Sequence, residues 1–274
     1  MGKNFRQRFI LITLSTVCFL LILCVSMNSK VFGEENHLNK NSKITIFLAG
    51  DSTVSSYPTS SAPRAGWGQV FEMMFNDKII VKNEAASGRS SKSFILEGRL
   101  DSILKEIDKG DYLFIQFGHN DEKVNDPTRY TEPSSTYKSY LKQYIDGARN
   151  KGANPVLVTP VERRRFSVDG IAQDSHGKYP EAMKELGLEE NVPVIDLTEK
   201  SKALFQELGP ELTKDIFLWL DPHSESNYPN GIQDNTHFQE GGAKQIAQLV
   251  VEGICELKLH LRNYVTKDIK EELK

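Results

Sequence analysis

Short polar segments of the chain contain the residue types that nucleophilic acyl transfer requires. Ser52 offers a hydroxyl nucleophile, and His237 offers a base that can accept its proton. Asp234 lies three residues before His237, close enough for its carboxylate to fix the imidazole tautomer and to stabilise the imidazolium. Ser52, His237 and Asp234 are therefore the candidate catalytic residues for acyl transfer through a serine.

Acyl transfer also needs hydrogen-bond donors fixed around the oxyanion of the tetrahedral intermediate. The backbone N–H groups of Ser52 and Gly88 and the side-chain amide of Asn120 can supply these donors. Gly88 suits this role because a residue without a Cβ lets substrate and backbone approach closely. We therefore predict an oxyanion hole formed by Ser52, Gly88 and Asn120.

Each of these residues also has an ordinary structural interpretation. Ser52 can cap a turn or helix, Asn120 can form an Asx turn, and Asp234 with His237 can form a capping pair. Asp51 is a poorer catalytic candidate, because a carboxylate at this position usually binds neighbouring backbone N–H groups. The chemical interpretation depends on the segments being brought together in the fold.

The elements that must position these residues follow from short apolar runs that alternate with helical stretches. Short β-branched runs that end at Gly or Pro are typical of buried strands. Such runs occur at 44–49, 79–81, 112–117, 155–158 and 192–195. Helices are predicted at 67–76, 99–108, 135–151, 178–189 and 239–258. This alternation predicts an α/β fold, a parallel sheet with helices on both faces.

In such a sheet, the segments that follow the carboxyl ends of the strands gather at one edge. Gly50-Asp51-Ser52 follows the first strand, 83–89 the second, and Gly118-His119-Asn120-Asp121 the third. Asp234 and His237 come just before the final helix. We therefore expect all four polar segments to lie at this edge.

The four segments resemble the sequence blocks of the SGNH (GDSL-like) hydrolase superfamily. The matching residues are Gly50-Asp51-Ser52, Gly88, Asn120, and Asp234-x-x-His237. A finer pattern is similar to the rhamnogalacturonan acetylesterase branch. It consists of Gly-Asp-Ser-Thr-Val at 50–54, Gly66-Trp67-Gly68, Gly-Arg-Ser-Ser at 88–91, and Asp-Asn-Thr-His-Phe at 234–238. The resemblance covers about 44–257, and four motifs in order are far more specific than any one alone.

The resemblance implies a three-layer α/β/α, flavodoxin-like fold with a five-stranded parallel sheet, and neither metal nor other cofactor. It further implies a secreted serine esterase that deacetylates a plant cell-wall polysaccharide, rhamnogalacturonan first among them, through an acetyl-Ser52 intermediate. Alternatives within the superfamily are an acetylxylan esterase, a lipase or a thioesterase. An inactive carbohydrate-binding protein is the alternative from another class, and the intact set of Ser52, His237, Asp234 and Asn120 argues against it.

Several further residues at the same edge are candidates for substrate binding. Arg163, Arg164 and Arg165 follow the fourth strand, and Arg89 follows the second. They form either a solvated basic surface or a partner for a uronate carboxylate of the polymer. His119 either orders the Asn120 loop or touches substrate.

Two other histidines, His176 and His223, lie in segments without a clear pattern and are expected at the surface. Long loops are expected at 121–134, 160–177 and 218–236. No pair of histidines has the close spacing of a zinc site, which argues against metal binding.

Residues 1–33 have the layout of a secretory signal peptide. Positively charged residues precede an apolar run from Phe9 to Val25, and Val31 and Gly33 are small enough for a cleavage site. The alternative is an N-terminal membrane anchor, because the run approaches the ~20 residues that span a bilayer.

Residues 34–274 are predicted to form a single domain with a core at about 43–258, since no flexible linker divides them. They carry 30 Lys and Arg against 37 Asp and Glu, once the four basic residues of the first 33 are removed. This acidic balance argues against nucleic acid or an anionic membrane as partner. We expect a secreted monomer whose partner is an acetylated polysaccharide, in contact with a membrane only if residues 1–33 are not cleaved. Cys255, the one cysteine after residue 33, leaves no intramolecular disulfide.

Overall fold

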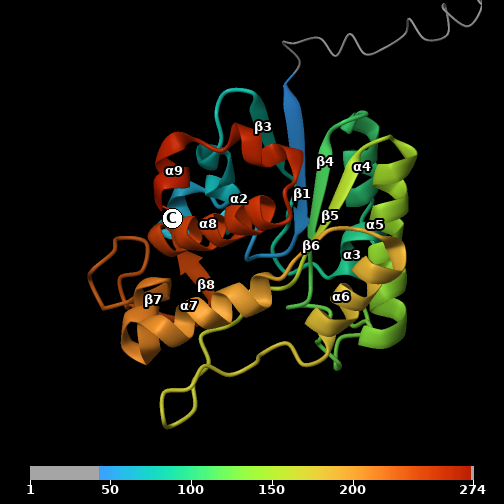
Figure 1. The fold of residues 1–274 in the computed structure, drawn as a ribbon. Helices are drawn as coiled ribbons and strands as arrows, with labels where there is room; N and C mark the ends of the chain where they lie inside the picture. Colours follow the sequence, from blue (N-terminus) through green and yellow to red (C-terminus); the bar gives the residue numbers. More distant parts are fainter. Residues whose placement is uncertain (1–42, 273–274) are drawn as a thin grey trace, which may run out of the picture. The chain divides into compact units, whose positions relative to one another are not determined.

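A five-stranded parallel sheet lies at the centre of residues 43–272, the part of the chain that the computed structural model describes (Figure 1). Its strands are β1 (Ile44–Gly50), β3 (Ile79–Asn83), β4 (Tyr112–Gln116), β5 (Asn154–Val158) and β6 (Val194–Ile195). They are arranged in the order β3-β1-β4-β5-β6, and every neighbouring pair is parallel. This is the flavodoxin-like strand order, and the predicted α/β fold class is confirmed.

Helices cover both faces of this sheet, which makes three layers (Figure 1). One face packs against α2 (Trp67–Val70), α7 (Leu197–Leu212), α8 (Glu240–Glu256) and α9 (Lys267–Glu272). The other face packs against α3 (Ser91–Leu96), α4 (Arg99–Glu106), α5 (Lys138–Asn150) and α6 (Tyr179–Glu190). Short 3₁₀ turns lie at Thr59–Ser61, Phe71–Met74, Thr213–Asp215 and His260–Tyr264, and a π-helical turn at Pro133–Tyr137 precedes α5.

Strand β1 shows why the sheet is buried on both sides. Ile46 and Leu48 belong to the core beneath α8, whereas Phe47 and Ala49 belong to the core beneath α5. All four side chains are at most 1% exposed. Because successive side chains of a strand point to opposite faces, a continuous apolar run is what a strand between two helical layers requires.

A second, antiparallel sheet was not predicted from the sequence. It consists of β2 (Arg64–Ala65), β8 (Ile232–Gln239) and β7 (Phe217–Leu220), in the order β2-β8-β7. β2 is too short to give a pattern, and β7 and β8 fall largely in the segment expected as a long loop. This sheet matters because β8 contains Asp234 and His237 and leads directly into α8.

The other predicted elements agree with the structure to within a few residues, with three differences. The helix predicted at 67–76 is divided into α2 and a 3₁₀ turn, and α3 and α7 were not predicted. The predicted signal peptide or anchor at residues 1–33 lies outside the described residues. Within 43–272, no helix is long and apolar enough to cross a bilayer.

The first turn of α8 packs closely on the backbone before β7. A Cβ on Gly242 would lie 2.0 Å from the carbonyl oxygen of Ile216, whereas a Cβ on Gly241 would meet no atom within 4 Å. Gly242 therefore permits the contact that holds the junction of β8 and α8 against the second sheet.

We predict that Gly242→Ala lowers the free energy of unfolding by about 1–3 kcal/mol, because the added methyl overlaps backbone that cannot move away cheaply. Gly241→Ala, the matched control, does not lower it and raises it by up to about 1 kcal/mol, because alanine favours the helix more than glycine does. Urea unfolding followed by circular dichroism measures both. Equal losses in the two variants would contradict the packing role assigned to Gly242.

Candidate active site

The three predicted catalytic side chains lie in one hydrogen-bonded row. Ser52 is in the turn after β1, and its Oγ is 2.9 Å from Nε2 of His237. Nδ1 of His237 is 2.7 Å from Oδ2 of Asp234. The row therefore joins the main sheet to the second sheet through residues 185 positions apart in the chain.

An irregularity in β8 makes this row possible. Phe217 of β7 pairs with Phe238, but Trp219 pairs with Gln233. The one residue between Phe217 and Trp219 therefore faces the four residues 234–237 of β8. Such a bulge bends the strand and changes where its side chains point. Residues 218–236 were expected to form a long loop, and a bulged strand occupies the end of that segment instead.

The bulge also fixes the carboxylate of Asp234. Oδ1 accepts hydrogen bonds from the backbone N–H groups of Thr236, at 2.7 Å, and His237, at 3.0 Å. Burial acts to raise the pKa of Asp234, but the hydrogen bonds from the side chain and backbone of His237 and from Thr236 outweigh it and lower the pKa to about 2. Asp234 is therefore ionised across the ordinary pH range and able to stabilise a positive charge on His237.

The turn that presents Ser52 is held by a buried chain of side-chain hydrogen bonds. Oδ1 of Asp51 accepts from the backbone N–H of Thr53, at 2.9 Å, and from its hydroxyl, at 2.8 Å. The Thr53 hydroxyl accepts from the Gln116 amide at 2.7 Å, and Gln116 accepts from the Trp67 indole at 2.8 Å. The structural role expected of Asp51 is confirmed, and its connection to Gln116 and Trp67 was not foreseen.

Asn120 is held in one orientation by its neighbours. Its amide nitrogen donates to the carbonyl of Arg89 at 3.0 Å, and its Oδ1 accepts from Arg129 at 3.3 Å. The same guanidinium nitrogen lies 3.5 Å from the carbonyl oxygen of Gly88. Within residues 43–272, the second N–H of the Asn120 amide has no acceptor, so it is available to a substrate oxygen. Gly88 has a φ of +81°, a conformation that glycine adopts without strain.

Asp121 connects the segments that contain Gly88 and Asn120, although the sequence analysis gave it no role. Its carboxylate accepts from the backbone N–H of Ser91 at 3.1 Å, from the Ser91 hydroxyl, and from the Thr131 hydroxyl at 2.9 Å. Burial raises the pKa of Asp121 to about 7. The one local signal that could have indicated this role is the place of Asp121 in Gly-His-Asn-Asp, directly after Asn120.

The sequence of this chain matches a known protein family. The model of the GDSL-like lipase/acylhydrolase family matches residues 48–244. The chain belongs to this GDSL-like lipase/acylhydrolase family.

Members of known name or structure resemble this acylhydrolase over most of the chain. It is 51% identical to rhamnogalacturonan acetylesterase RhgT of Bacillus subtilis, over 84% of this chain and 98% of the relative. Probable rhamnogalacturonan acetylesterase YesY of the same organism is 48% identical, over 81% and 98%. The crystal structure of Bacillus subtilis YxiM has a TM-score of 0.69 at 30% identity, over 80% of this chain and 58% of that one. The predicted family is confirmed, and the chain is a carboxylic ester hydrolase.

Two histidines form a buried pair behind the site of this acylhydrolase. His119 is buried with Nδ1 3.4 Å from Oδ2 of Asp51, without hydrogen-bond alignment. Its ring centroid is 4.4 Å from that of His176, whose Nε2 lies 2.8 Å from the carbonyl oxygen of Val161. The expectation that His176 lies at the surface was wrong, because its ring packs against His119 and its two nitrogens lie against Glu122 and the carbonyl of Val161. The burial of the His119 side chain favours a role in ordering the Asn120 loop over contact with substrate.

The arginines after β5 differ in how their side chains are used. Arg163 pairs with Glu122 and donates to the carbonyl of Ser175 at 3.2 Å. These contacts close the 160–177 segment onto the 121–134 segment. Arg163 therefore has a structural partner already, and its geometry favours the structural interpretation over a uronate contact.

Arg164 and Arg165 point to different surroundings. Arg164 lies over the ring of Trp219, 4.6 Å from its centroid, and donates to the side chain of Asn235 at 3.2 Å. Trp219 donates to the same Asn235 oxygen at 2.9 Å, so the pair supports the bulge next to Asp234. Arg165 is exposed, and its side chain has no hydrogen bond within 43–272. No local pattern in the sequence distinguishes the surroundings of Arg163, Arg164 and Arg165.

Burial lowers the pKa of His119 to about 4, although the Asp51 carboxylate acts in the opposite direction. An unfolded chain binds the proton near the ordinary value of 6.5. We therefore predict that protonation of His119 in the unfolded state removes stability as the pH falls from about 6.5 to about 4. In His119→Gln, the free energy of unfolding in urea falls by ~2–3 kcal/mol less over this interval than in the wild type.

His223→Asn, which replaces an exposed imidazole, is the control and keeps the wild-type pH dependence. Asp51 loses its His119 neighbour in His119→Gln, so the difference between this variant and the wild type reports the His119–Asp51 pair as a unit. The same slope in His119→Gln and the wild type would show that folding does not displace the His119 pKa.

Proposed function

We propose that the protein is a secreted acetylesterase that removes acetyl groups from a pectic polysaccharide, with rhamnogalacturonan as its substrate. The observation that carries the proposal is the hydrogen-bonded row from Asp234 through His237 to Ser52. It occurs in a chain half identical to a rhamnogalacturonan acetylesterase. The pattern of residues 1–33 supports secretion, and a protein in the culture medium that begins at Glu34 would establish it.

Acylation follows from the geometry of the row. His237 Nε2 takes the proton of Ser52 as Oγ attacks the acetyl carbonyl carbon, and ionised Asp234 stabilises the imidazolium. The backbone N–H groups of Ser52 and Gly88 and the Asn120 amide donate to the oxyanion. The bond from carbon to the sugar oxygen then breaks, His237 protonates that oxygen, and the acetyl group stays on Ser52.

Deacylation uses the same groups with water as the nucleophile. His237 accepts a proton from water as the oxygen attacks the acetyl carbon of the acyl-enzyme. The tetrahedral intermediate collapses when the bond to Ser52 Oγ breaks, and His237 returns the proton to that oxygen. Acetate leaves and the enzyme regains its starting state. Losing one oxyanion donor typically costs about 10²–10³ in turnover, so Asn120 contributes several kcal/mol to this cycle.

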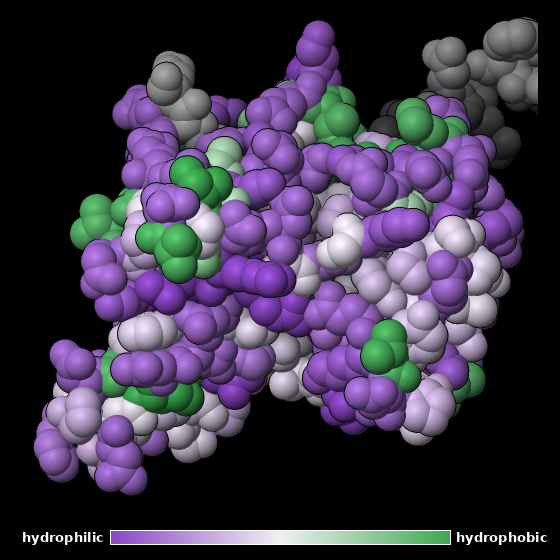
Figure 2. All heavy atoms as spheres, turned by 90° about the horizontal axis from the view of Figure 1, so that it is seen from below, coloured by the Kyte–Doolittle hydropathy of each residue, from purple (hydrophilic) through white to green (hydrophobic). Residues whose placement is uncertain are grey.

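The surface around the site does not favour a lipid substrate. Figure 2 shows the face seen from below in Figure 1, where the parallel strands have their carboxyl ends. Hydrophobic residues there are scattered among hydrophilic ones. The large hydrophobic side chains most exposed in the described residues are Met73, Leu96, Val124, Val168, Ile171, Leu188, Leu212 and Leu257. A lipase is expected to have a contiguous apolar patch instead.

We predict that the purified protein releases acetate from acetylated rhamnogalacturonan faster than from acetylated xylan, and also hydrolyses 4-nitrophenyl acetate. Ser52→Ala abolishes all three reactions, with a loss of about 10⁴-fold or more, because no other nucleophile is placed to form the acyl-enzyme. An acetate assay with purified polymers measures this. Faster release of acetate from xylan would identify acetylated xylan as the preferred substrate. Full activity of Ser52→Ala would contradict the proposed acetyl-Ser52 mechanism.

A further inference from the structure

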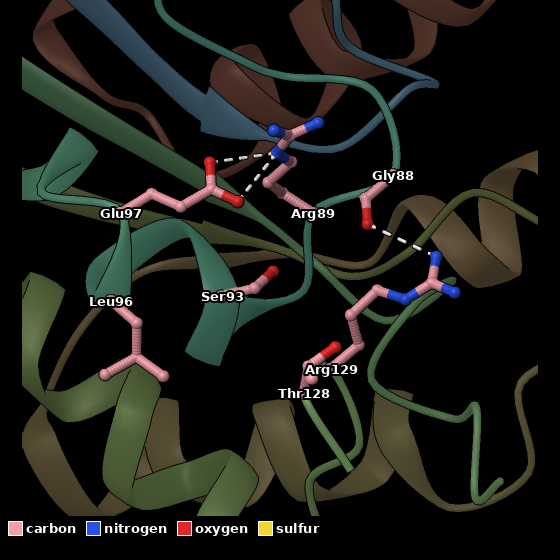
Figure 3. A pocket seen from close by; sticks show the side chains of 7 residues that line it. All are labelled: Gly88, Arg89, Ser93, Leu96, Glu97, Thr128 and Arg129. Atoms are coloured by element: carbon pink, nitrogen blue, oxygen red, sulfur yellow. Dashed lines mark hydrogen bonds and ion pairs between the residues drawn. The ribbon is translucent and has the colours of Figure 1, made fainter. Parts of the chain in front are cut away.

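A pocket of about 450 Å³ opens beside the candidate oxyanion hole (Figure 3). We refer to it as the Arg89–Arg129 pocket, and it is lined by Gly88, Arg89, Ser93, Leu96, Glu97, Thr128 and Arg129. These residues come from the turn before α3, from α3 itself and from the 121–134 segment. The pocket shares Gly88 with the predicted oxyanion hole, so a group bound in it lies next to the place where an ester would meet Ser52.

The ion pairs around this pocket leave an excess of positive charge. Arg89 and Arg99 share the single carboxylate of Glu97, at 3.0 Å and 2.9 Å. Arg129 pairs with Asp126 at 2.6 Å. The residues that line the pocket therefore carry two guanidinium groups, Arg89 and Arg129, against the one carboxylate of Glu97, and this excess of positive charge favours an anionic ligand.

Each of the two lining arginines is held in place by contacts that leave part of its guanidinium free. Arg89 binds Glu97 through Nε and the carbonyl of Ser87 through NH1, at 2.8 Å. Arg129 binds Asp126 through Nε, and its NH1 contacts Gly88 and Asn120. Figure 3 shows these directions, with Arg89 turned towards Glu97 and Arg129 towards the Gly88 carbonyl. Within 43–272, NH2 of either arginine has no acceptor.

We propose that the Arg89–Arg129 pocket binds a uronate carboxylate of the polymer, and that Arg89 and Arg129 thereby select acidic over neutral acetylated polysaccharides. The planar guanidinium groups match the geometry of a carboxylate and stay charged at any relevant pH. Leu96, which is 68% exposed at the edge of the pocket, offers an apolar contact for a sugar ring. This inference rests on the proposed function and specifies how that site recognises its substrate.

The test uses deacetylated oligogalacturonate as a competitive inhibitor of 4-nitrophenyl acetate hydrolysis by the full chain. The inhibition constant rises about tenfold or more in Arg89→Gln, because a charge-assisted hydrogen bond to the carboxylate is lost. Arg99→Gln is the matched control: it removes the same charge beside the same Glu97 but does not line the pocket. It changes the inhibition constant less than threefold.

A second control changes the ligand instead of the protein. Methyl-esterified oligogalacturonate has no free carboxylate, so Arg89→Gln and the wild type bind it with the same inhibition constant. Arg129→Gln is expected to raise the inhibition constant for the acidic ligand as well. It also lowers kcat, since Arg129 orients Asn120.

Three results would overturn the proposal: no inhibition of the wild type, an unchanged inhibition constant in Arg89→Gln, or the same loss in Arg99→Gln. The reporter ester is small and neutral, so its hydrolysis shows that Ser52 and His237 work whatever the polymer. Failure of the subsite is therefore distinguishable from failure of the acetylesterase proposal, in which acetylated rhamnogalacturonan itself is not deacetylated.

Discussion

The buried carboxylate of Asp51 constrains the part of the structure on which the site depends. Removing a carboxylate from water costs several kcal/mol unless it is hydrogen-bonded. Burial acts to raise the pKa of Asp51, and the hydrogen bonds that Oδ1 accepts from the backbone and hydroxyl of Thr53 act to lower it. The chain of bonds continues through Gln116 at the end of β4 to Trp67 at the start of α2. The turn that bears Ser52 is therefore positioned from three elements at once.

The rest of the row depends on a different part of the fold. His237 comes from the second sheet, so it meets Ser52 only when that sheet is correctly packed on the first. The contact of Gly242 with the backbone of Ile216 fixes the beginning of α8, directly after β8. Arg164 and Trp219 support Asn235 from the other side. Tertiary packing thus determines the distance between His237 and Ser52, although neither Gly242 nor Arg164 belongs to the row.

The main sheet and the row of Ser52, His237 and Asp234 followed from the sequence because both leave local signals. Buried parallel strands are continuous apolar runs, and the polar motifs directly follow them. The second sheet left no such signal, since β2 has two residues and the bulge in β8 interrupts any alternation. The burial of His176 and the partners of Arg163 and Arg164 depend on contacts across tens of residues. No local pattern reports such contacts, which is why three adjacent arginines looked equivalent.

The bulge in β8 has a consequence for any redesign of this protein. A designer who seeks thermal stability would regularise the strand, deleting residues so that β7 and β8 pair without interruption. Uninterrupted pairing would add backbone hydrogen bonds between β7 and β8. The shortened β8 would, however, no longer hold Asp234 against His237. At this one place, the stability of the sheet and the geometry of the row oppose each other. Natural variation in length is therefore expected to be tolerated in the 221–231 segment and rejected between Gln233 and Phe238.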